Sequence, residues 1–371
     1  MTRILRPIAG LFAATLLFVP TAFAATPLQP GSDVVAVRAV QAAALLPPGV
    51  SPVVAVLDTP FETDHPSLQP RLVEGYDALT GTHDVSISAG DLHLFTHGTA
   101  VASIISADTL AGLWPVSVFP AAHIMPVKIC CAASGDGHST NSLLLRQGIL
   151  YAAGIPNDNG QSATEPARVI NVSYVFSDEY DQLLVDALTR ATQAGAVVVY
   201  ALGEGEPKIS PVIARIPGVI GVRTASATLN TPVLNQQMPI VPAPGGGFLA
   251  LLPSGISALP VPSMGIVDGS SFATAVTSAV VAMMRAANPA LTPGDVAGIL
   301  ASPSVYDAEG LDALLAVQQA KSAEASAPPA GSSGGAIDSF TLAVLALLLL
   351  SGKNLRPRKQ RALNGGSERA F

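Results

Sequence analysis

Cysteine is nearly absent from this sequence: its 371 residues include two cysteines, and these are neighbours, Cys130 and Cys131. Adjacent cysteines cannot cross-link distant segments, so the fold is not a disulfide scaffold. We predict two small buried residues here, and a disulfide between the two neighbours is the alternative. Aromatic residues (5%) and charged residues (12%) are also scarce, whereas 49% of the chain is hydrophobic. This composition excludes wholesale disorder and supplies a large core.

Basic residues are few in the central part of the chain. Residues 25–335 contain 11 Lys and Arg against 24 Asp and Glu, a formal charge of 11 − 24 = −13. Phosphate backbones repel so acidic a polypeptide, so we expect no nucleic-acid partner. The charge mainly favours solubility.

Each end of the chain carries a short apolar run beside basic residues. In residues 1–24, two arginines precede the apolar run and Ala-Phe-Ala follows it. This is the pattern of a cleaved signal peptide, and an uncleaved anchor is the alternative. Residues 336–352 are apolar and residues 353–371 are basic, which predicts a short membrane segment with a cytoplasmic tail. Together with Gly-Ser-Ser-Gly-Gly at residues 331–335, they resemble the C-terminal sorting tails of some bacterial exported proteins, and a plain C-terminal anchor is the alternative. We expect an exported protein, tethered to the membrane by its C-terminal segment unless that segment is cleaved.

Two stretches have the composition of linkers. Residues 25–50 are rich in Pro and Ala and lack clear periodicity, which indicates a linker or a short pro-segment. Residues 321–335 are dominated by Ala, Ser, Pro and Gly. The folded domain is therefore predicted to span residues 51–320.

Within that domain, apolar runs rich in Val and Ile alternate with longer helical patterns. The predicted strands are residues 53–57, 124–129, 169–172 and 196–201, and the predicted helices are residues 98–107, 141–153, 180–194, 271–287, 295–301 and 311–320. Continuous apolar strands are typical of sheets that are buried on both faces. The alternation predicts an α/β fold with three layers, α/β/α, and a mainly parallel central sheet.

Three polar residues stand at the ends of these elements. Asp58 follows the first predicted strand, His97 begins a helix, and Ser271 begins the long apolar helix. A serine hydroxyl needs an adjacent base, and a histidine oriented by a carboxylate serves that purpose at neutral pH. A serine at a helix N-terminus also directs its own N–H at a developing oxyanion. We therefore predict a catalytic triad.

The segments around these three residues resemble the signature blocks of the subtilisin-like serine peptidase family. The blocks are Asp-Thr followed by His-Pro-Ser-Leu at residues 58–68, His-Gly-Thr-Ala-Val-Ala at residues 97–102, and Gly-Ser-Ser-Phe-Ala at residues 269–273. The order Asp, His, Ser is itself the known order of subtilisin. The resemblance covers about residues 50–320. It implies a monomeric endopeptidase that cleaves polypeptides through an acyl-enzyme and requires no cofactor, with structural calcium possible at a site we do not locate.

Further blocks resemble the substrate-binding parts of the same family. Met-Pro-Val-Lys at residues 125–128 resembles the strand before the substrate-binding loop, so residues 131–138 would form a wall of the cleft. Ile-Asn-Val-Ser at residues 170–173 resembles the strand that pairs with extended substrate. The resemblance therefore implies substrate contacts at Ser173, Tyr174, Val175 and Gly203. Val175 replaces a frequent glycine, which predicts a narrower first pocket and a preference for small side chains.

One position departs from the family pattern. The family supplies a second oxyanion donor from an Asn side chain, and this chain has Glu204 there, in Ala-Leu-Gly-Glu. An ionised carboxylate repels a developing negative charge, and the loss of one such donor costs about 3–4 kcal/mol. Glu204 is either protonated and a donor, or turned away, or the mark of an impaired peptidase that binds peptides or partners.

Other functions fit these residues less well. His93 and His97 have the spacing of a zinc pair, but no Glu stands between them as a metalloprotease requires, and we predict no metal ligands. Asp58 alone resembles a turn residue, and Ser270 with Ser271 resembles a helix cap. An α/β-hydrolase needs a histidine after its serine, and no histidine follows Ser271.

Overall fold

The computed structural model describes the chain over residues 37–87, 96–108, 117–131, 140–174, 181–204, 212–225, 233–235, 238–253 and 264–326. The predicted signal peptide (1–24), membrane segment (336–352) and basic tail (353–371) lie outside these residues. So do residues 25–36 and 327–335 of the two predicted linkers. These five assignments remain predictions.

A sheet of eight strands forms the middle layer, in the order β2-β3-β1-β4-β5-β6-β8-β7. The strands are β1 (Val53–Asp58), β2 (Tyr76–Asp77), β3 (His123–Lys128), β4 (Val169–Val172), β5 (Val197–Ala201), β6 (Val219–Thr224), β7 (Val233–Asn235) and β8 (Met238–Ala243). All neighbouring strands are parallel except β7, which runs antiparallel to β8 at one edge. Every residue of β1, β4 and β5 is buried, as expected for strands covered on both faces. The mainly parallel sheet is thus confirmed.

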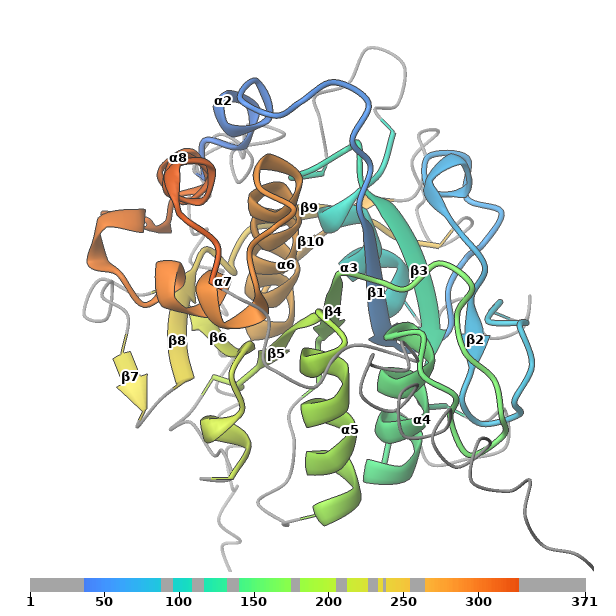
Figure 1. The fold of residues 1–371 in the computed structure, drawn as a ribbon. Helices are drawn as coiled ribbons and strands as arrows, with labels where there is room; N and C mark the ends of the chain where they lie inside the picture. The colour runs from blue at the N-terminus through green and yellow to red at the C-terminus, as the bar shows by residue number, and fades with distance from the viewer. Residues whose placement is uncertain are drawn as a thin grey trace, which may run out of the picture. The chain divides into compact units, whose positions relative to one another are not determined.

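Helices cover both faces of this sheet (Figure 1). The helices are α2 (Ala39–Ala43), α3 (His97–Ile105), α4 (Ser142–Ala152), α5 (Gln182–Gln193), α6 (Ser270–Ala287), α7 (Pro293–Leu300) and α8 (Ala313–Ser322). α4 and α5 share one apolar core with one face of the sheet, while α3, α6 and α8 share a second core with the other face. The predicted three-layer α/β/α fold is therefore confirmed, and the six predicted helices match α3–α8 within a few residues.

Local polar contacts fix where the helices begin. The Asn141 side chain accepts a hydrogen bond from the Leu144 N–H, and Asp181 does the same for Leu183. Such caps satisfy backbone donors that the first turn of a helix leaves free. α7 begins with a full capping box, in which Thr292 and Asp295 bond each other's backbone N–H.

Helix α6 is the centre of the second core. Its side chains are almost all buried, and it contacts β1, β4, β5, β6 and β8. Within the described part of the chain, it is also the one helix long and apolar enough to cross a membrane. Because 89% of that window is buried inside the domain, α6 is a core helix.

The described part of the first predicted linker, residues 37–50, differs from the prediction. Helix α2 packs on α8 and α6, and the Val37 carbonyl accepts a hydrogen bond of 2.9 Å from the Ala313 N–H. Arg38 donates through Nε to the fully buried carboxylate of Asp312 at 2.6 Å. This stretch is part of the folded domain because its alanines and Val37 bury apolar surface that a linker leaves in water.

Two small antiparallel pairs complete the described chain. They are β9 (Phe248–Leu251) with β10 (Met264–Val267), and β11 (Tyr306–Asp307) with β12 (Gly310–Leu311). The first pair contacts α3 through β9. Its last strand ends just before Asp268, which leads the chain into α6.

Candidate active site

Asp58 is the last residue of β1 and is 3% exposed. Its Oδ1 accepts a hydrogen bond of 2.7 Å from the N–H of Thr59. The Thr59 hydroxyl in turn accepts one of 2.8 Å from the N–H of Gly98, in the first turn of α3. The Asp-Thr pair thereby ties the end of β1 to the start of α3, which places the helix's first residue, His97, beside Asp58.

Gly98 permits this close approach. A Cβ atom at position 98 would lie 2.6 Å from the carbonyl oxygen of Thr59 and 3.1 Å from the ring of Phe61. Real Cβ atoms do not come that close to backbone, so a larger residue would push α3 away from β1. The His-Gly part of the sequence block therefore has a steric cause.

We expect Gly98→Ala to separate His97 from Asp58. Overpacking of this kind should lower the free energy of unfolding by about 1–3 kcal/mol and reduce kcat/KM as well. The measurements are thermal denaturation and peptide hydrolysis. Gly298→Ala in α7 is the control, because a Cβ there meets nothing within 4 Å. A fully active Gly98→Ala protein would contradict the steric argument.

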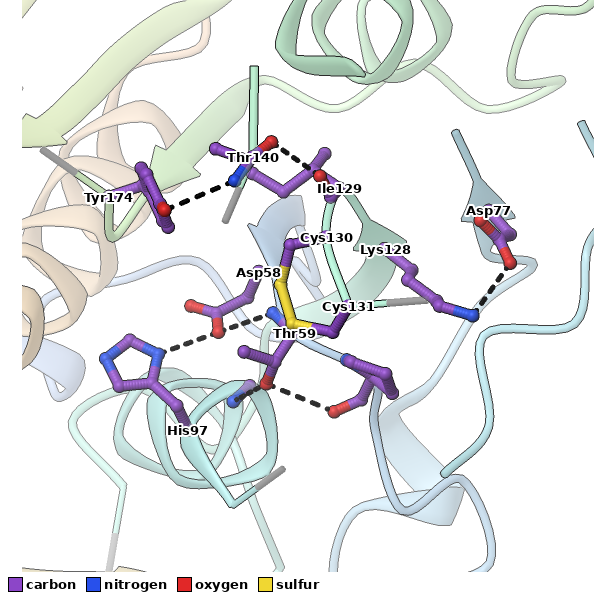
Figure 2. Close-up of a disulfide and its surroundings, with 12 residues drawn as sticks. Asp58, Thr59, Asp77, His97, Lys128, Ile129, Cys130, Cys131, Thr140 and Tyr174 are labelled. Carbon is purple, nitrogen blue, oxygen red and sulfur yellow. Dashed lines mark hydrogen bonds and ion pairs between the residues drawn. A yellow bond between two sulfur atoms is a disulfide. The ribbon is translucent and has the colours of Figure 1, made fainter. Parts of the chain in front are cut away.

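His97 and Asp58 form the central polar contact of the site (Figure 2). His97 Nδ1 lies 2.7 Å from Asp58 Oδ1. The His97 side chain is 32% exposed and that of Asp58 is 2% exposed, so the imidazole is reachable while the carboxylate is not. The second oxygen of Asp58, Oδ2, is buried and accepts no hydrogen bond from any residue that the structure describes.

The Asp58 carboxylate controls the basicity of His97. Burial alone lowers the pKa of His97, but the charge of Asp58 and the hydrogen bond to it outweigh that effect. The pKa is therefore raised above its ordinary value of 6.5. The imidazole ring also lies against the Phe272 ring, with 5.4 Å between centroids, so the histidine sits beside the first turn of α6.

Ser271 is in that first turn. Its Oγ donates a hydrogen bond of 3.2 Å to the carbonyl oxygen of Ser173, just after β4. Among the described residues, Ser271 Oγ makes no hydrogen bond to His97. The backbone N–H of Ser271 also donates to none of these residues. The site thus presents a free helix N-terminal donor next to the serine hydroxyl.

Glu204 approaches the same helix from the end of β5. Its carboxylate accepts hydrogen bonds from the Ser270 N–H and from the Thr224 hydroxyl, the latter at 3.2 Å from Oε2. Glu204 therefore caps α6 at the N–H that precedes Ser271. A carboxylate is favourable there because the helix dipole places partial positive charge at this end. Thr224 is a partner that the sequence did not suggest.

The residues with a predicted substrate-binding role lie at the same edge of the sheet. Ser173 and Tyr174 follow β4, and Gly203 follows β5 with a positive φ of 79°. Tyr174 accepts a hydrogen bond of 3.2 Å at its hydroxyl from the N–H of Thr140. Val175 and residues 132–138 of the predicted cleft wall lie outside the described residues.

The cysteines were predicted as two small buried residues, and the prediction is wrong in that they are linked: Cys130 and Cys131 form the disulfide that was the alternative. Both are buried, as predicted. Figure 2 shows the disulfide beside Asp58 and Thr59, at the end of β3. The N–H of Ile129, directly before it, donates to the Asp58 carbonyl at 3.0 Å. The disulfide therefore borders the strand end that carries Asp58.

The described residues contain no group of three or more His, Cys, Asp or Glu side chains arranged to hold a metal ion. A structural calcium needs several oxygen ligands in one place. Backbone and amide carbonyl oxygens also serve as calcium ligands, and the calcium site stays a prediction without a location.

The strand order and the long buried helix behind the carboxyl ends of β4 and β5 define the class of fold, a three-layer α/β fold of the subtilisin-like type. The sequence model of the Subtilase family matches residues 49–315. This match covers more than half of the chain, and the chain belongs to the subtilase family.

Several known proteins are similar to this chain. An "Extracellular protease" of Xanthomonas campestris is 27% identical over 278 residues, which cover 68% of this chain and 47% of the relative. A "Thermophilic serine proteinase" of a Bacillus species is 32% identical over 150 residues, covering 40% of this chain and 32% of the relative. The chain thus spans less than half the length of these relatives.

Solved structures agree on the fold. A protease from Pseudoalteromonas arctica is 26% identical, with a TM-score of 0.61, and the match covers 76% of this chain and 94% of that one. Fervidolysin from Fervidobacterium pennivorans is 21% identical, with a TM-score of 0.57, and the match covers 77% of this chain and 45% of that one. The second likeness concerns the fold alone.

Proposed function

We propose that this protein is a serine endopeptidase that hydrolyses polypeptides, with Ser271 as nucleophile, His97 as general base and Asp58 as the orienting carboxylate. The observation that carries the proposal is the 2.7 Å contact between His97 Nδ1 and Asp58 Oδ1, at the sheet edge that also holds Ser271. Membership of the subtilase family and the protease names of the relatives support it.

The geometry supports a defined proton path. Because His97 Nδ1 donates to Asp58, its Nε2 is left as the base. The Ser271 hydroxyl turns from the Ser173 carbonyl to His97, since catalytic hydrogen bonds are often made only with substrate in place. His97 takes the hydroxyl proton while Ser271 Oγ bonds to the substrate carbonyl carbon, and then gives that proton to the leaving amine. Water repeats the sequence on the acyl-enzyme and releases the acid.

The oxyanion of the tetrahedral intermediate binds at the start of α6. The N–H of Ser271 donates to none of the described residues and lies at the positive end of the helix dipole, so it is a donor for this oxygen. The contact between Glu204 and the Ser270 N–H supports the arrangement in which Glu204 is turned away from that oxygen. The Glu204 carboxylate still opposes the negative charge that develops on the oxyanion.

Glu204 favours a second candidate function, an impaired member of the family that binds peptides without cleaving them. A fluorophosphonate probe separates the two, because it reacts covalently only with an activated serine. Labelling of the wild-type protein, and none of Ser271→Ala, supports the peptidase. Absence of labelling of the wild-type protein at every pH from 4 to 8 would rule out the peptidase function.

The pH dependence of labelling follows from the raised pKa of His97. His97 acts as a base only when neutral, so activity should be low in acid. It should rise as the pH passes the raised pKa, which lies above the ordinary 6.5, and then level off. The measurement is the second-order labelling rate, or kcat/KM, between pH 5 and 9. A midpoint below 6.5 would contradict the role of the Asp58 charge.

We further propose that the protein acts outside the cytoplasmic membrane. The relative from Xanthomonas campestris is named as extracellular, and residues 1–24 have the pattern of a cleaved signal peptide. Tethering by residues 336–352 belongs to the same proposal. Mass spectrometry of the exported protein tests both segments, and intact ends on a cytoplasmic protein would contradict export.

A further inference from the structure

A chain of buried polar groups runs from the middle of α6, through β4, to the proposed nucleophile. Ser278 Oγ lies 2.9 Å from Asn171 Oδ1, Asn171 Nδ2 lies 2.9 Å from Ser173 Oγ, and Ser173 Oγ lies 2.9 Å from the carbonyl oxygen of Ser271. Asn171 and Ser278 are fully buried, and Ser173 is 4% exposed. This series of hydrogen bonds therefore begins on α6 at Ser278, passes through β4, and ends on α6 at Ser271.

The direction of every hydrogen bond follows from the last one. The carbonyl of Ser271 can only accept, so Ser173 must donate its single hydroxyl proton to it. Ser173 Oγ is then an acceptor toward Asn171, which must present its NH₂ group. That orientation turns Oδ1 of Asn171 to Ser278, which must donate. If any one of these groups reversed its role as donor or acceptor, the neighbouring hydrogen bonds could not form as they do.

Ser173 holds Ser271 from both sides. The Ser173 hydroxyl donates to the Ser271 carbonyl at 2.9 Å, while the Ser271 hydroxyl donates to the Ser173 carbonyl at 3.2 Å. The second bond must break when the nucleophile turns to its base. The first bond persists through that turn, because it involves only the backbone of Ser271.

Burying an amide between apolar neighbours is costly in itself. Asn171 stands between Ile170 and Val172 in a fully buried strand, where a polar group without partners is strongly unfavourable. An apolar residue of similar size would fill the space without this cost. The two hydrogen bonds of Asn171 offset this cost, and the series that they belong to ends at Ser271.

We propose that Asn171 and Ser278 are positioning residues for the nucleophile, acting through Ser173. They fix the Ser173 hydroxyl as a donor, which holds the first turn of α6 and the Ser271 backbone at a set distance from β4. Neither residue can touch substrate, because both are fully buried. This inference rests on the proposed peptidase function.

The test is a comparison of kcat and KM for variants of these two residues in the full chain. Asn171→Asp keeps the shape but presents acceptor oxygens when ionised, and Asn171→Leu removes both bonds. We expect kcat to fall on the order of 10- to 100-fold, the cost of misplacing a reacting group by about 1 Å, with little change in KM. Ser278→Ala should lower kcat by a smaller factor. Ser278→Thr keeps a hydroxyl, so its kcat should stay near that of the wild type.

Thr277→Val is the matched control. Thr277 is the neighbour of Ser278 on α6 and is also fully buried. Among the residues that the structure describes, its hydroxyl donates only to the Ala273 carbonyl of its own helix, at 2.9 Å. This variant should lower Tm and leave kcat within about threefold of wild type, because it removes a single hydrogen bond within α6. A merely structural role for Asn171 would give the same pattern.

Two outcomes would overturn the proposal. One is an unchanged kcat in folded Asn171→Asp and Asn171→Leu proteins. The other, which decides if those variants do not fold, is an unchanged kcat in Ser278→Ala. Failure of the wild-type protein to react with a fluorophosphonate is a different result, and it would reject the peptidase function itself.

Discussion

Replacing Ser271 by alanine is expected to reduce kcat on the order of 10⁶-fold, the size of loss measured for the serine of subtilisin, a related triad. His97→Ala should cost about as much, because the two residues act as one unit. Asp58→Asn should cost on the order of 10⁴-fold, since an amide cannot stabilise the imidazolium or hold the same tautomer. Hydrolysis of a fluorogenic peptide, with active-site titration, measures all three.

The neighbouring serine provides the control. The Ser270 side chain makes no hydrogen bond within the described residues, and Ser270→Ala leaves its N–H to Glu204 in place. We expect that variant to stay within about tenfold of wild type, well short of the loss that follows removal of a nucleophile. If Ser270→Ala removed activity and Ser271→Ala did not, the assignment of the nucleophile would be wrong.

Glu204→Asn is expected to raise kcat at neutral pH, on the order of 10²-fold. An amide at this position adds a donor for the oxyanion, and one such donor is worth about 10²–10³ in kcat. The substitution also removes a charge that opposes the developing oxyanion. The measurement is kcat for peptide hydrolysis at pH 7, beside the wild type.

The same substitution should destabilise the domain slightly. Glu204 caps α6 through the Ser270 N–H, and loss of a charged cap costs about 1 kcal/mol. Glu204→Gln separates the two effects, because it removes the charge but has the length to keep the contact. An equal or lower kcat in both variants would show that Glu204 does not limit catalysis.

Much of the fold was predictable from the sequence. Strands β1, β4 and β5 consist mostly of Val, Ile and Ala, since both faces of the sheet are covered, and their apolar runs located them. A less uniform apolar run, Ile-Met-Pro-Val, located β3. The ends of these runs also located Asp58 and Ser271, because polar residues after buried strands or before buried helices stand out. The structure places His97 Nδ1 2.7 Å from Asp58 Oδ1, and the catalytic role of the pair stays a prediction.

Other features depend on contacts that a sequence does not encode locally. Glu204 was known only as an acidic residue in an unusual place, and its bond to the Ser270 N–H requires the strand and the helix to be placed together. Adjacent Cα atoms lie closer together than the two ends of most disulfides do, so the sequence favoured two unlinked cysteines over the disulfide that is present. Helix α2 was missed because it is five residues long and is held by α8, far away in the chain.

The burial partners of Asn171 and Ser278 also could not be predicted. Each is a polar residue inside an otherwise apolar element, and such residues must find partners once buried. Their hydrogen bond to each other depends on the contact between β4 and α6, which the sequence alone does not give.

Hydrogen bonds anchor both ends of the described domain. The chain enters at Val37, which bonds Ala313, and Asn288 at the far end of α6 donates to the carbonyls of Ala320 and Ala323. Helix α6 has 18 residues and is about 27 Å long, with Ser271 at its opposite end. Ala323 therefore lies about one length of α6 away from Ser271. The two ends of α6 thus have different tasks: one carries the proposed nucleophile, and the other anchors the last residues of the described domain.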